Sequence, residues 1–253
     1  MNIALHGKTI AIEGIDGSGK TTIATELAKR LGVEYIKDPA KSVFGMSSAE
    51  YKELFNSVEK KQNHSTIAQL LSMGYTSINN IDGCVCDRHI LSNFFYNGND
   101  DTIHYFDAQV QAGDVPDLTI VLFCGQEERI RRIRERNPED PDLKKDQKVL
   151  EANYNKMMTY AASRGIPCME VSSEFVPKDD LVRTLADIVV EYCQKIDEYQ
   201  SDYGETASIF IKSRWAKRAE KAFDRRLEEY LGNFHYRTYD MNGNPRIIDE
   251  ASL

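Results

Sequence analysis

The sequence has no hydrophobic run that approaches the roughly 20 residues needed to cross a bilayer. Its first residues, MNIALHGK, also lack the charged start and long apolar stretch of a signal peptide. We therefore expect neither membrane insertion nor secretion, and the predicted location is the cytoplasm.

Paired cysteine motifs are absent as well. The five cysteines include no CxxC pair, and their odd number does not suit a framework of disulfides or a zinc knuckle. A reducing environment with small, buried thiols is the simpler interpretation. The cysteines are Cys84, Cys86, Cys124, Cys168 and Cys193.

An excess of positive charge is also lacking, since 32 Lys+Arg stand against 40 Asp+Glu and give a net charge of −8. A surface that wraps nucleic acid needs a net basic face, so no nucleic-acid polymer is expected as a partner. A local basic pocket remains compatible with this balance. With 41% hydrophobic and 28% charged residues, the 253-residue chain resembles a folded globular protein with one large core and an extension.

Short apolar runs bounded by turn residues predict five β-strands, at 9–12, 33–36, 84–86, 118–124 and 168–171. Segments with helical periodicity lie between them, for example Ile23, Leu27 and Leu31. Strands that alternate with helices predict an α/β fold, with a doubly wound parallel five-stranded sheet and helices on both faces.

The alternation stops near residue 200, which divides the chain into a core at 1–200 and an extension at 201–253. Apolar residues then recur every four positions and predict one long amphipathic helix. They are Ala207, Ile211, Trp215, Ala219, Phe223, Leu227 and Leu231. Residues 212–226 carry seven Lys/Arg against two acids, so the outer face is basic.

This helix has three possible roles, which are to pack on the core, to extend a dimer interface, or to cover a substrate cleft. Packing is the usual fate of such a stripe. Further on, Asn242-Gly243 between two strand-like runs predicts a hairpin.

The segment TIAIEGIDGSGKTTIATELAKRL contains the pattern G-x-x-x-x-G-K-[ST], placed between a predicted strand and a predicted helix. A loop without side-chain bulk can turn its N–H groups around phosphate oxygens. Lysine adds a charge at the β- and γ-phosphates, and the following helix points its positive end at them. We therefore expect a P-loop NTPase fold that binds a nucleoside triphosphate through Gly14, Gly17, Ser18, Gly19, Lys20, Thr21 and Thr22.

The motif alone does not separate kinases from GTPases or motor ATPases. The guanine-reading motif Asn-Lys-x-Asp is missing, because the only Asn-Lys, Asn155-Lys156, is followed by two methionines. No apolar strand ends in paired Asp-Glu, which disfavours a motor or remodelling ATPase.

The strand Cys84–Cys86 leads into Asp87 and Arg88. A carboxylate at a strand tip can meet the Mg²⁺ shell held by Thr21, so Thr21 and Asp87 are the predicted metal ligands. Arg88 offers a planar fork suited to a phosphate. A carboxylate and an arginine at the carboxyl edge of a parallel sheet suit transfer between two phosphates. The alternative is a solvated ion pair at a strand end.

Three segments, IAIEGIDGSGKTT, VCDRHILSNFFYNG and VPDLTIVLFCGQEERIRRIRERN, resemble the signature blocks of thymidylate kinases in order and approximate spacing. The resemblance covers most of residues 5–196. It implies Mg²⁺-dependent transfer of the γ-phosphoryl group of ATP to dTMP, a homodimer, and a lid at about 137–148.

The resemblance also implies roles for single residues. Asp16 matches the carboxylate that reaches the deoxyribose 3′-hydroxyl, and Arg88 matches the arginine that grips the acceptor phosphate, with Asp87 beside it. Tyr96 matches the aromatic residue that crowds the sugar 2′ position. The remaining implied contacts with the acceptor are Asp38, Pro39, Ser92, Asn93 and Asn97.

Members without a basic residue in the loop supply one from the lid, and Ile15–Ser18 contains none. Arg132 is therefore expected at ATP, and Arg136, Lys144 and Lys145 are the candidates that reach the transferred phosphoryl group. Arg132 and Arg136 are i, i+4 neighbours on one predicted helix face. The alternative is a solvated basic helix.

The family usually carries an arginine before the Asp-Arg block that bonds to the thymine O4, but AQLLSMGYTSINNIDGCVC contains none. Its replacements could be Gln69, Thr76, Ser77 or Asn80. Three hypotheses stay open at this stage, namely a dTMP kinase, a kinase for another or modified pyrimidine deoxynucleotide such as dUMP, and a regulatory nucleotide-binding module without catalysis.

Overall fold

The computed structural model describes residues 5–37, 41, 44–47, 49–51, 53, 64–78, 81–174 and 176–231. Its centre is a five-stranded parallel sheet in the order β2-β3-β1-β4-β5. The strands are β1 Thr9–Gly14, β2 Glu34–Lys37, β3 Cys84–Asp87, β4 Leu118–Phe123 and β5 Cys168–Ser172. All five predicted strands are confirmed. The run LTIVLF of β4 is buried along its whole length, as expected for a strand covered on both faces.

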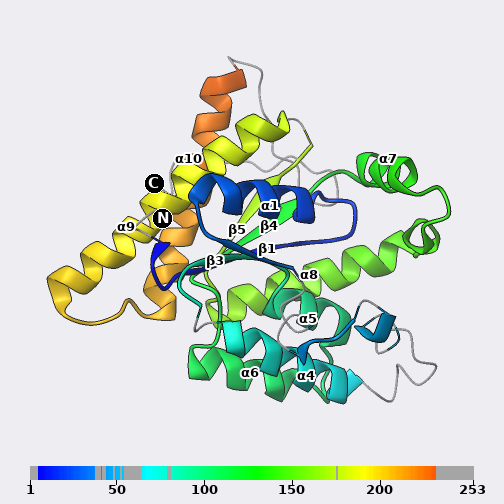
Figure 1. Cartoon of the computed structure of the whole chain (residues 1–253), viewed down its shortest axis with the longest axis horizontal. Helices are drawn as coiled ribbons and strands as arrows, with labels where there is room; N and C mark the ends of the chain where they lie inside the picture. The colour runs from blue at the N-terminus through cyan, green and yellow to red at the C-terminus, as the bar shows by residue number, and fades with distance from the viewer. Residues whose placement is uncertain are drawn as a thin grey trace.

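The helices cover both faces of the sheet, which confirms the doubly wound architecture (Figure 1). They are α1 Lys20–Leu31, α4 His64–Ile78, α5 Ile90–Asn97, α6 Ile103–Ala112, α7 Gln126–Arg136, α8 Gln147–Arg164, α9 Lys178–Tyr203 and α10 Ile209–Leu231, with the 3₁₀ turn η2 Pro141–Lys144. In the described part of the chain, no helix is long and apolar enough to span a membrane.

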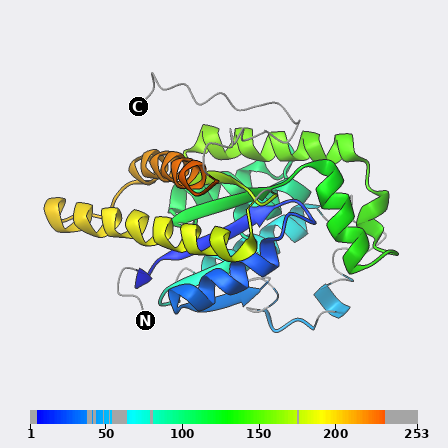
Figure 2. The ribbon, with the colours of Figure 1, turned by 90° about the horizontal axis from the view of Figure 1, so that it is seen from above.

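Each face of the sheet has its own hydrophobic core. On one face, Leu27 of α1 and Leu185 of α9 pack with Ile12 of β1. On the other face, Phe94 of α5 and Tyr154 of α8 belong to a second cluster. Figure 2 shows α1 and α9 on one side of the strands and α8 on the opposite side. The carboxyl ends of the strands are left free to carry polar side chains.

The predicted long helix of the extension is confirmed as α10, and it packs on the core beside α9 and β5 (Figure 2). Ala216, Phe223 and Leu227 are fully buried there. Trp215 and Ala219 of the predicted stripe are only partly buried. On a helix with 3.6 residues per turn, residues four positions apart differ by about 40° around the axis. The stripe therefore turns gradually around the helix, and part of it lies outside the face that contacts the core.

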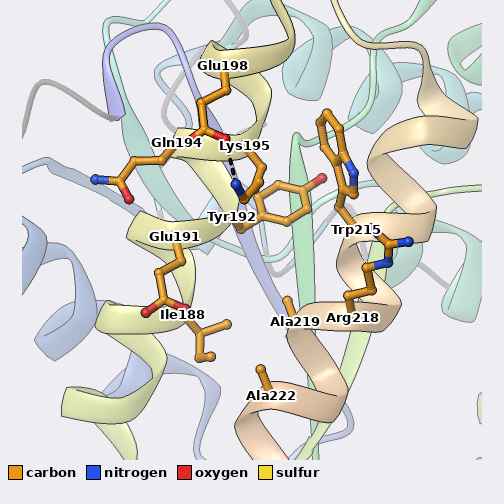
Figure 3. A pocket seen from close by; sticks show the side chains of 10 residues that line it. All are labelled: Ile188, Glu191, Tyr192, Gln194, Lys195, Glu198, Trp215, Arg218, Ala219 and Ala222. Atoms are coloured by element: carbon orange, nitrogen blue, oxygen red, sulfur yellow. Dashed lines mark hydrogen bonds and ion pairs between the residues drawn. The ribbon is translucent and has the colours of Figure 1, made fainter. Parts of the chain in front are cut away.

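Where the stripe leaves the core, a groove of about 360 Å³ opens between α9 and α10. Tyr192 and Lys195 line it from α9, and Trp215 and Arg218 line it from α10 (Figure 3). The ammonium of Lys195 pairs with Glu198 across 2.6 Å. The hairpin predicted around residues 242–243 lies outside the described residues.

Candidate nucleotide site

The predicted phosphate-binding loop turns directly from the end of β1 into α1. Its glycines Gly14, Gly17 and Gly19 have φ angles of 135°, 88° and 91°, in the region that side chains rarely adopt. A Cβ atom on Gly14 would lie 2.2 Å from the carbonyl oxygen of Leu122. The loop therefore needs glycine both for its backbone angles and for its contact with β4.

Lys20 is buried within this loop, with 6% of its surface exposed. Its ammonium donates to the Ile15 carbonyl (2.8 Å) and lies 3.6 Å from the Asp16 carboxylate. Burial, reinforced by repulsion from Arg88, lowers the pKa of Lys20 from 10.5 to about 8. The loop thus holds its cation in place before any phosphate arrives.

This shift predicts a pH-dependent affinity for ATP. A triphosphate beside Lys20 favours the charged ammonium, so binding above pH 8 must be accompanied by uptake of a proton. Affinity should then fall as the pH rises from 8 to 10. We expect calorimetry at pH 8.5, in two buffers of different ionisation enthalpy, to show this uptake for the wild type. Lys20→Met should lose both the uptake and most of the affinity, whereas binding without proton uptake in the wild type would contradict the shift.

The two predicted metal ligands meet at the mouth of the loop. The Thr21 hydroxyl donates to Asp87 Oδ2 across 2.5 Å, and the Tyr35 hydroxyl lies 3.4 Å from the same oxygen. Asp87 is 3% exposed, and its Oδ1 is buried without a hydrogen-bond partner in the described structure. A hydroxyl and an unsatisfied carboxylate oxygen are hard donors that fit Mg²⁺. Among the described residues, no group of three His, Cys, Asp or Glu forms an all-protein metal cage.

Arg88 and Asp16 form the centre of the acceptor side. The Arg88 guanidinium donates to Asp16 Oδ1 (2.6 Å) and to the Ser92 hydroxyl (3.3 Å). Tyr96 donates to Asp16 Oδ2 (2.9 Å), and its ring lies beneath the guanidinium. The structure therefore brings Asp16 of the loop together with Arg88, Ser92 and Tyr96, which lie more than 70 positions later, and the resemblance assigned all four to one substrate.

The charges around Asp16 decide its ionisation. Burial opposes the carboxylate, but the positive charges of Lys20, Arg88 and Lys145 outweigh it and hold the pKa of Asp16 far below its usual range. Asp16 is therefore an anion under all ordinary conditions, able to accept a hydrogen bond from a hydroxyl.

The predicted lid approaches this centre from the side of α7. Lys145 lies 3.5 Å from Asp16 Oδ2 and pairs with Asp142 at 2.6 Å. Arg132 is fixed by Glu128 (2.7 Å) and by the Ser173 carbonyl (2.7 Å).

The other two lid candidates are more exposed. Arg136 is 60% exposed and pairs with Asp140 (2.6 Å). Lys144 lies exposed in η2. The structure therefore places Lys145 and Arg132 beside the loop.

The P-loop, Asp87, Arg88 and α7 open into one cavity of about 820 Å³. It is lined by residues from the P-loop, the ends of β2 and β3, and α7. They are Asp16, Gly17, Gly19, Lys20, Thr21, Thr22, Lys37, Asp87, Arg88, Arg132, Ile133, Glu135 and Arg136. Donor-side and acceptor-side residues thus share one space large enough for two nucleotide phosphates.

Two of the predicted acceptor contacts, Asn93 and Asn97, are used inside the protein. The Asn93 amide donates to the Ala68 carbonyl (2.9 Å) and to Ser72 (3.3 Å) of α4. The side-chain amide of Asn97 donates to Oδ1 of Asn93 (3.0 Å), and both residues are 1% exposed. In this structure these amides tie α5 to α4, and any contact with a base stays a prediction.

The predicted base-side residues beyond α5 are only partly described. Thr76 donates to Asp114 (3.3 Å), and Ser77 donates to the carbonyl of Met73 (2.9 Å). Gln69 is exposed on α4. Asp38, Pro39 and Asn80 lie outside the described residues.

Sequence reasoning missed three residues of this site. Glu13 is fully buried directly before Gly14, Lys37 lines the cavity, and Arg129 is 3% exposed with its guanidinium 3.4 Å from the Asp16 carbonyl. A Cβ atom on Gly17 would lie 2.6 Å from Cγ of Arg129, so α7 packs directly on the loop. A charged residue inside the apolar strand TIAIEG is the signal that marks Glu13 in the sequence.

Comparison with known proteins agrees with this geometry. The family model described as thymidylate kinase matches residues 12–176. A probable thymidylate kinase of Methanococcus vannielii is 28% identical over 171 residues, which are 63% of this chain and 82% of the relative. A probable thymidylate kinase of Archaeoglobus fulgidus is 34% identical over 157 residues, which are 54% and 74% of the two chains.

The fold has a counterpart among solved structures. Thymidylate kinase from Candida albicans aligns with a TM-score of 0.51 over 73% of this chain and 91% of its own, at 18% identity. At that identity the match supports the shared fold alone, with its parallel sheet between helices.

Proposed function

This chain belongs to the thymidylate kinase family, and on that premise we propose that it transfers the γ-phosphoryl group of ATP to dTMP, forming ADP and dTDP. The observation that carries the proposal is the shared cavity. Lys20 and Thr21 of the P-loop open into the same space as Asp16 and Arg88.

On the donor side, the loop N–H groups and Lys20 would hold the β- and γ-phosphates, and Thr21 and Asp87 would hold Mg²⁺. When bound, Mg²⁺ supplies positive charge at the oxygens of the β- and γ-phosphates. Arg132 lies beside the loop, since a Cβ atom on Gly19 would lie 3.7 Å from its Nη1, and it would add charge at the phosphates. Lys145 and Arg136 would add positive charge at the transferred phosphoryl group when the lid closes over ATP.

On the acceptor side, Arg88 would grip the monophosphate, and Asp16 would accept a hydrogen bond from the sugar 3′-hydroxyl. Tyr96 would stand against the 2′ position and favour deoxyribose. Arg88 and Tyr96 already donate hydrogen bonds to Asp16. Hydrogen bonds to the acceptor would replace these existing ones. The acceptor then binds between side chains that are already ordered in the free protein. Less conformational entropy is therefore lost on binding.

The reaction needs no general base. The acceptor is a phosphate whose second pKa is near ~6, so its oxygen is already an anion at neutral pH. That oxygen attacks the γ-phosphorus as the bond to the β–γ bridging oxygen breaks. The protein contributes positioning and positive charge, which is how phosphoryl transfer is generally catalysed.

The identity of the base is a separate question. Described α4, from His64 to Ile78, carries no arginine that could bond to the thymine O4. This observation favours a second candidate, a kinase for another or modified pyrimidine deoxynucleotide.

An ATP-consumption assay with dTMP, dUMP, 5-hydroxymethyl-dUMP, dCMP, dGMP, dAMP and their ribose forms tests both. We expect the highest kcat/KM with dTMP. A preference for another pyrimidine would support the second candidate. Silence with every acceptor would contradict both and leave a regulatory nucleotide-binding module.

We also propose a homodimer. The family resemblance implies it, and α4 and α6 line a hollow of about 540 Å³ on which Met73 is 57% and Phe44 37% exposed. Apolar side chains gathered on one hollowed face are typical of an interface. The five free, buried cysteines suit a reducing compartment, and we propose the cytoplasm.

The dimer is tested by light scattering. We expect twice the chain mass for the wild type and a monomer for Met73→Glu, because a charge would be buried at the interface. Val149→Glu, at a position with 54% exposure on α8, is the matched control and should stay dimeric. A wild-type mass of one chain would refute the proposal.

A further inference from the structure

Glu13 is a fully buried acid that the proposed phosphate chemistry does not use. It sits in β1 directly before the first glycine of the loop. Burying a carboxylate costs several kcal/mol unless hydrogen bonds compensate. The contacts of this side chain therefore indicate why an acid stands in an otherwise apolar strand.

Those contacts all go to one turn. Oε1 of Glu13 accepts from the backbone N–H of His89 (2.7 Å) and of Ser92 (3.0 Å), and Oε2 accepts from the Ser92 hydroxyl. These are groups at the beginning of α5, whose N-cap residue His89 makes no side-chain cap. The first N–H groups of a helix need acceptors, and a negative charge is favoured there. Glu13 thus caps α5 from the neighbouring strand.

The capped turn carries Arg88 in a strained conformation. Its φ angle is 82°, and Arg88 is the one non-glycine residue with a positive φ in the described chain. Such a conformation is unfavourable for a residue with a side chain and persists only where the surroundings enforce it. The Arg88 N–H donates to the Ile12 carbonyl (3.0 Å), while Glu13 fixes His89 and Ser92. The backbone is therefore held on both sides of the arginine.

Ser92 extends this control to the guanidinium. Its hydroxyl donates to Glu13 and accepts from Nη1 of Arg88 (3.3 Å), while Nη2 of Arg88 reaches Asp16 (2.6 Å). The guanidinium is thus fixed by Asp16 of the loop and by Ser92, which is itself hydrogen-bonded to Glu13.

We propose that Glu13 is a positioning residue for the acceptor phosphate, which holds Arg88 by capping α5 and by orienting Ser92. This inference rests on the proposed function, because it requires that Arg88 binds the acceptor phosphate. Glu13 itself touches no substrate.

The test uses Glu13→Gln, which keeps the size of the side chain but replaces one carboxyl oxygen with an NH₂ group. The amide oxygen can still accept from the backbone, whereas the amide nitrogen would face the Ser92 hydroxyl as a competing donor. We expect dTMP to bind roughly tenfold to a hundredfold more weakly by calorimetry. Affinity for a non-hydrolysable ATP analogue should stay within twofold. Glu34→Gln, the same change at an exposed position on β2, is the matched control and should alter neither affinity.

A double-mutant cycle separates positioning from general stability. In an Arg88→Ala background, Glu13→Gln should cause no further loss of dTMP affinity, because the two residues act as a unit. Equal losses for dTMP and the ATP analogue, or the same loss in both backgrounds, would overturn the proposal. If Glu13→Gln does not fold, Ser92→Ala is the alternative variant, because it leaves both backbone hydrogen bonds to Glu13 intact. Unchanged dTMP affinity in Ser92→Ala would overturn the proposal that Glu13 holds Arg88 through Ser92.

One readout is independent of the substrate. The Nε–H NMR signal of Arg88, identified by its absence in Arg88→Ala, should shift in Glu13→Gln. An unshifted signal would overturn the positioning role even if dTMP proves not to be the acceptor. A shifted signal without turnover of dTMP would support the positioning of Arg88 by Glu13. It would reject only dTMP as the acceptor.

Discussion

Replacing Arg88 with alanine should lower kcat/KM for the nucleoside monophosphate by about 10²- to 10³-fold, the usual effect of removing one preorganised donor from a developing charge. The guanidinium faces the shared cavity and is fixed by Asp16 and Ser92, so its fork is ordered before the acceptor binds. Steady-state kinetics with each substrate varied in turn measures the effect. The loss should appear with the acceptor, and the KM for ATP should change little.

Two further substitutions at this position make the result specific. Arg88→Lys keeps the charge but loses the planar fork, so its activity should fall between those of the wild type and Arg88→Ala. Arg88→Gly should be as inactive as alanine but more stable to urea, because glycine tolerates the φ angle of 82°. Full turnover in Arg88→Ala would refute the assignment of this residue to the acceptor phosphate.

Replacing Phe223 with alanine should lower the free energy of unfolding by about 3–5 kcal/mol, the usual cost of removing a buried aromatic ring. Phe223 lies in α10, has no exposed surface and belongs to the same cluster as residues of α9 and the sheet. Urea denaturation measures the change. The KM values should stay near those of the wild type, since no residue of α10 is among those that line the shared cavity.

The matched control lies on the same helix. Phe210 is 68% exposed, so Phe210→Ala should change stability by no more than about 0.5 kcal/mol. Equal effects of the two substitutions would show that α10 adds little to the core. A large difference would establish the extension as part of the folding unit, held also by Lys212 on Asp117 (2.6 Å) and by Glu220 on the N–H of Glu170 in β5 (2.9 Å).

Features encoded within a few residues were predictable. Apolar runs between turn residues marked all five strands, most clearly β4, because a strand buried on both faces is rich in apolar residues. The glycine spacing marked the P-loop, because only glycine allows the positive φ angles and the approach to Leu122. The four-residue stripe marked α10 and its buried residues Phe223 and Leu227, but it follows the core face only in part, since Trp215 is partly buried and Ala216, outside the stripe, is fully buried.

Features that need a distant partner were not predictable. Asn93 is equally consistent with a base contact or with a structural amide, and only the packing of α5 on α4 puts it against Ala68. The four basic residues of the lid are indistinguishable in sequence. The fold separates them, since Lys145 reaches Asp16 while Arg136 pairs with Asp140.

The sequence by itself determined the order of strands and helices, the phosphate loop and the adjacency of Asp87 and Arg88 at the end of a strand, because each depends on neighbours along the chain. Only the tertiary structure decided that Glu13 caps α5, that Arg129 lies under the loop and that α10 seals the edge of β5. In each of these cases two charged or polar groups from distant segments meet where they are at least partly buried. A buried charge reveals its partner only when the folded chain brings that partner within hydrogen-bonding distance.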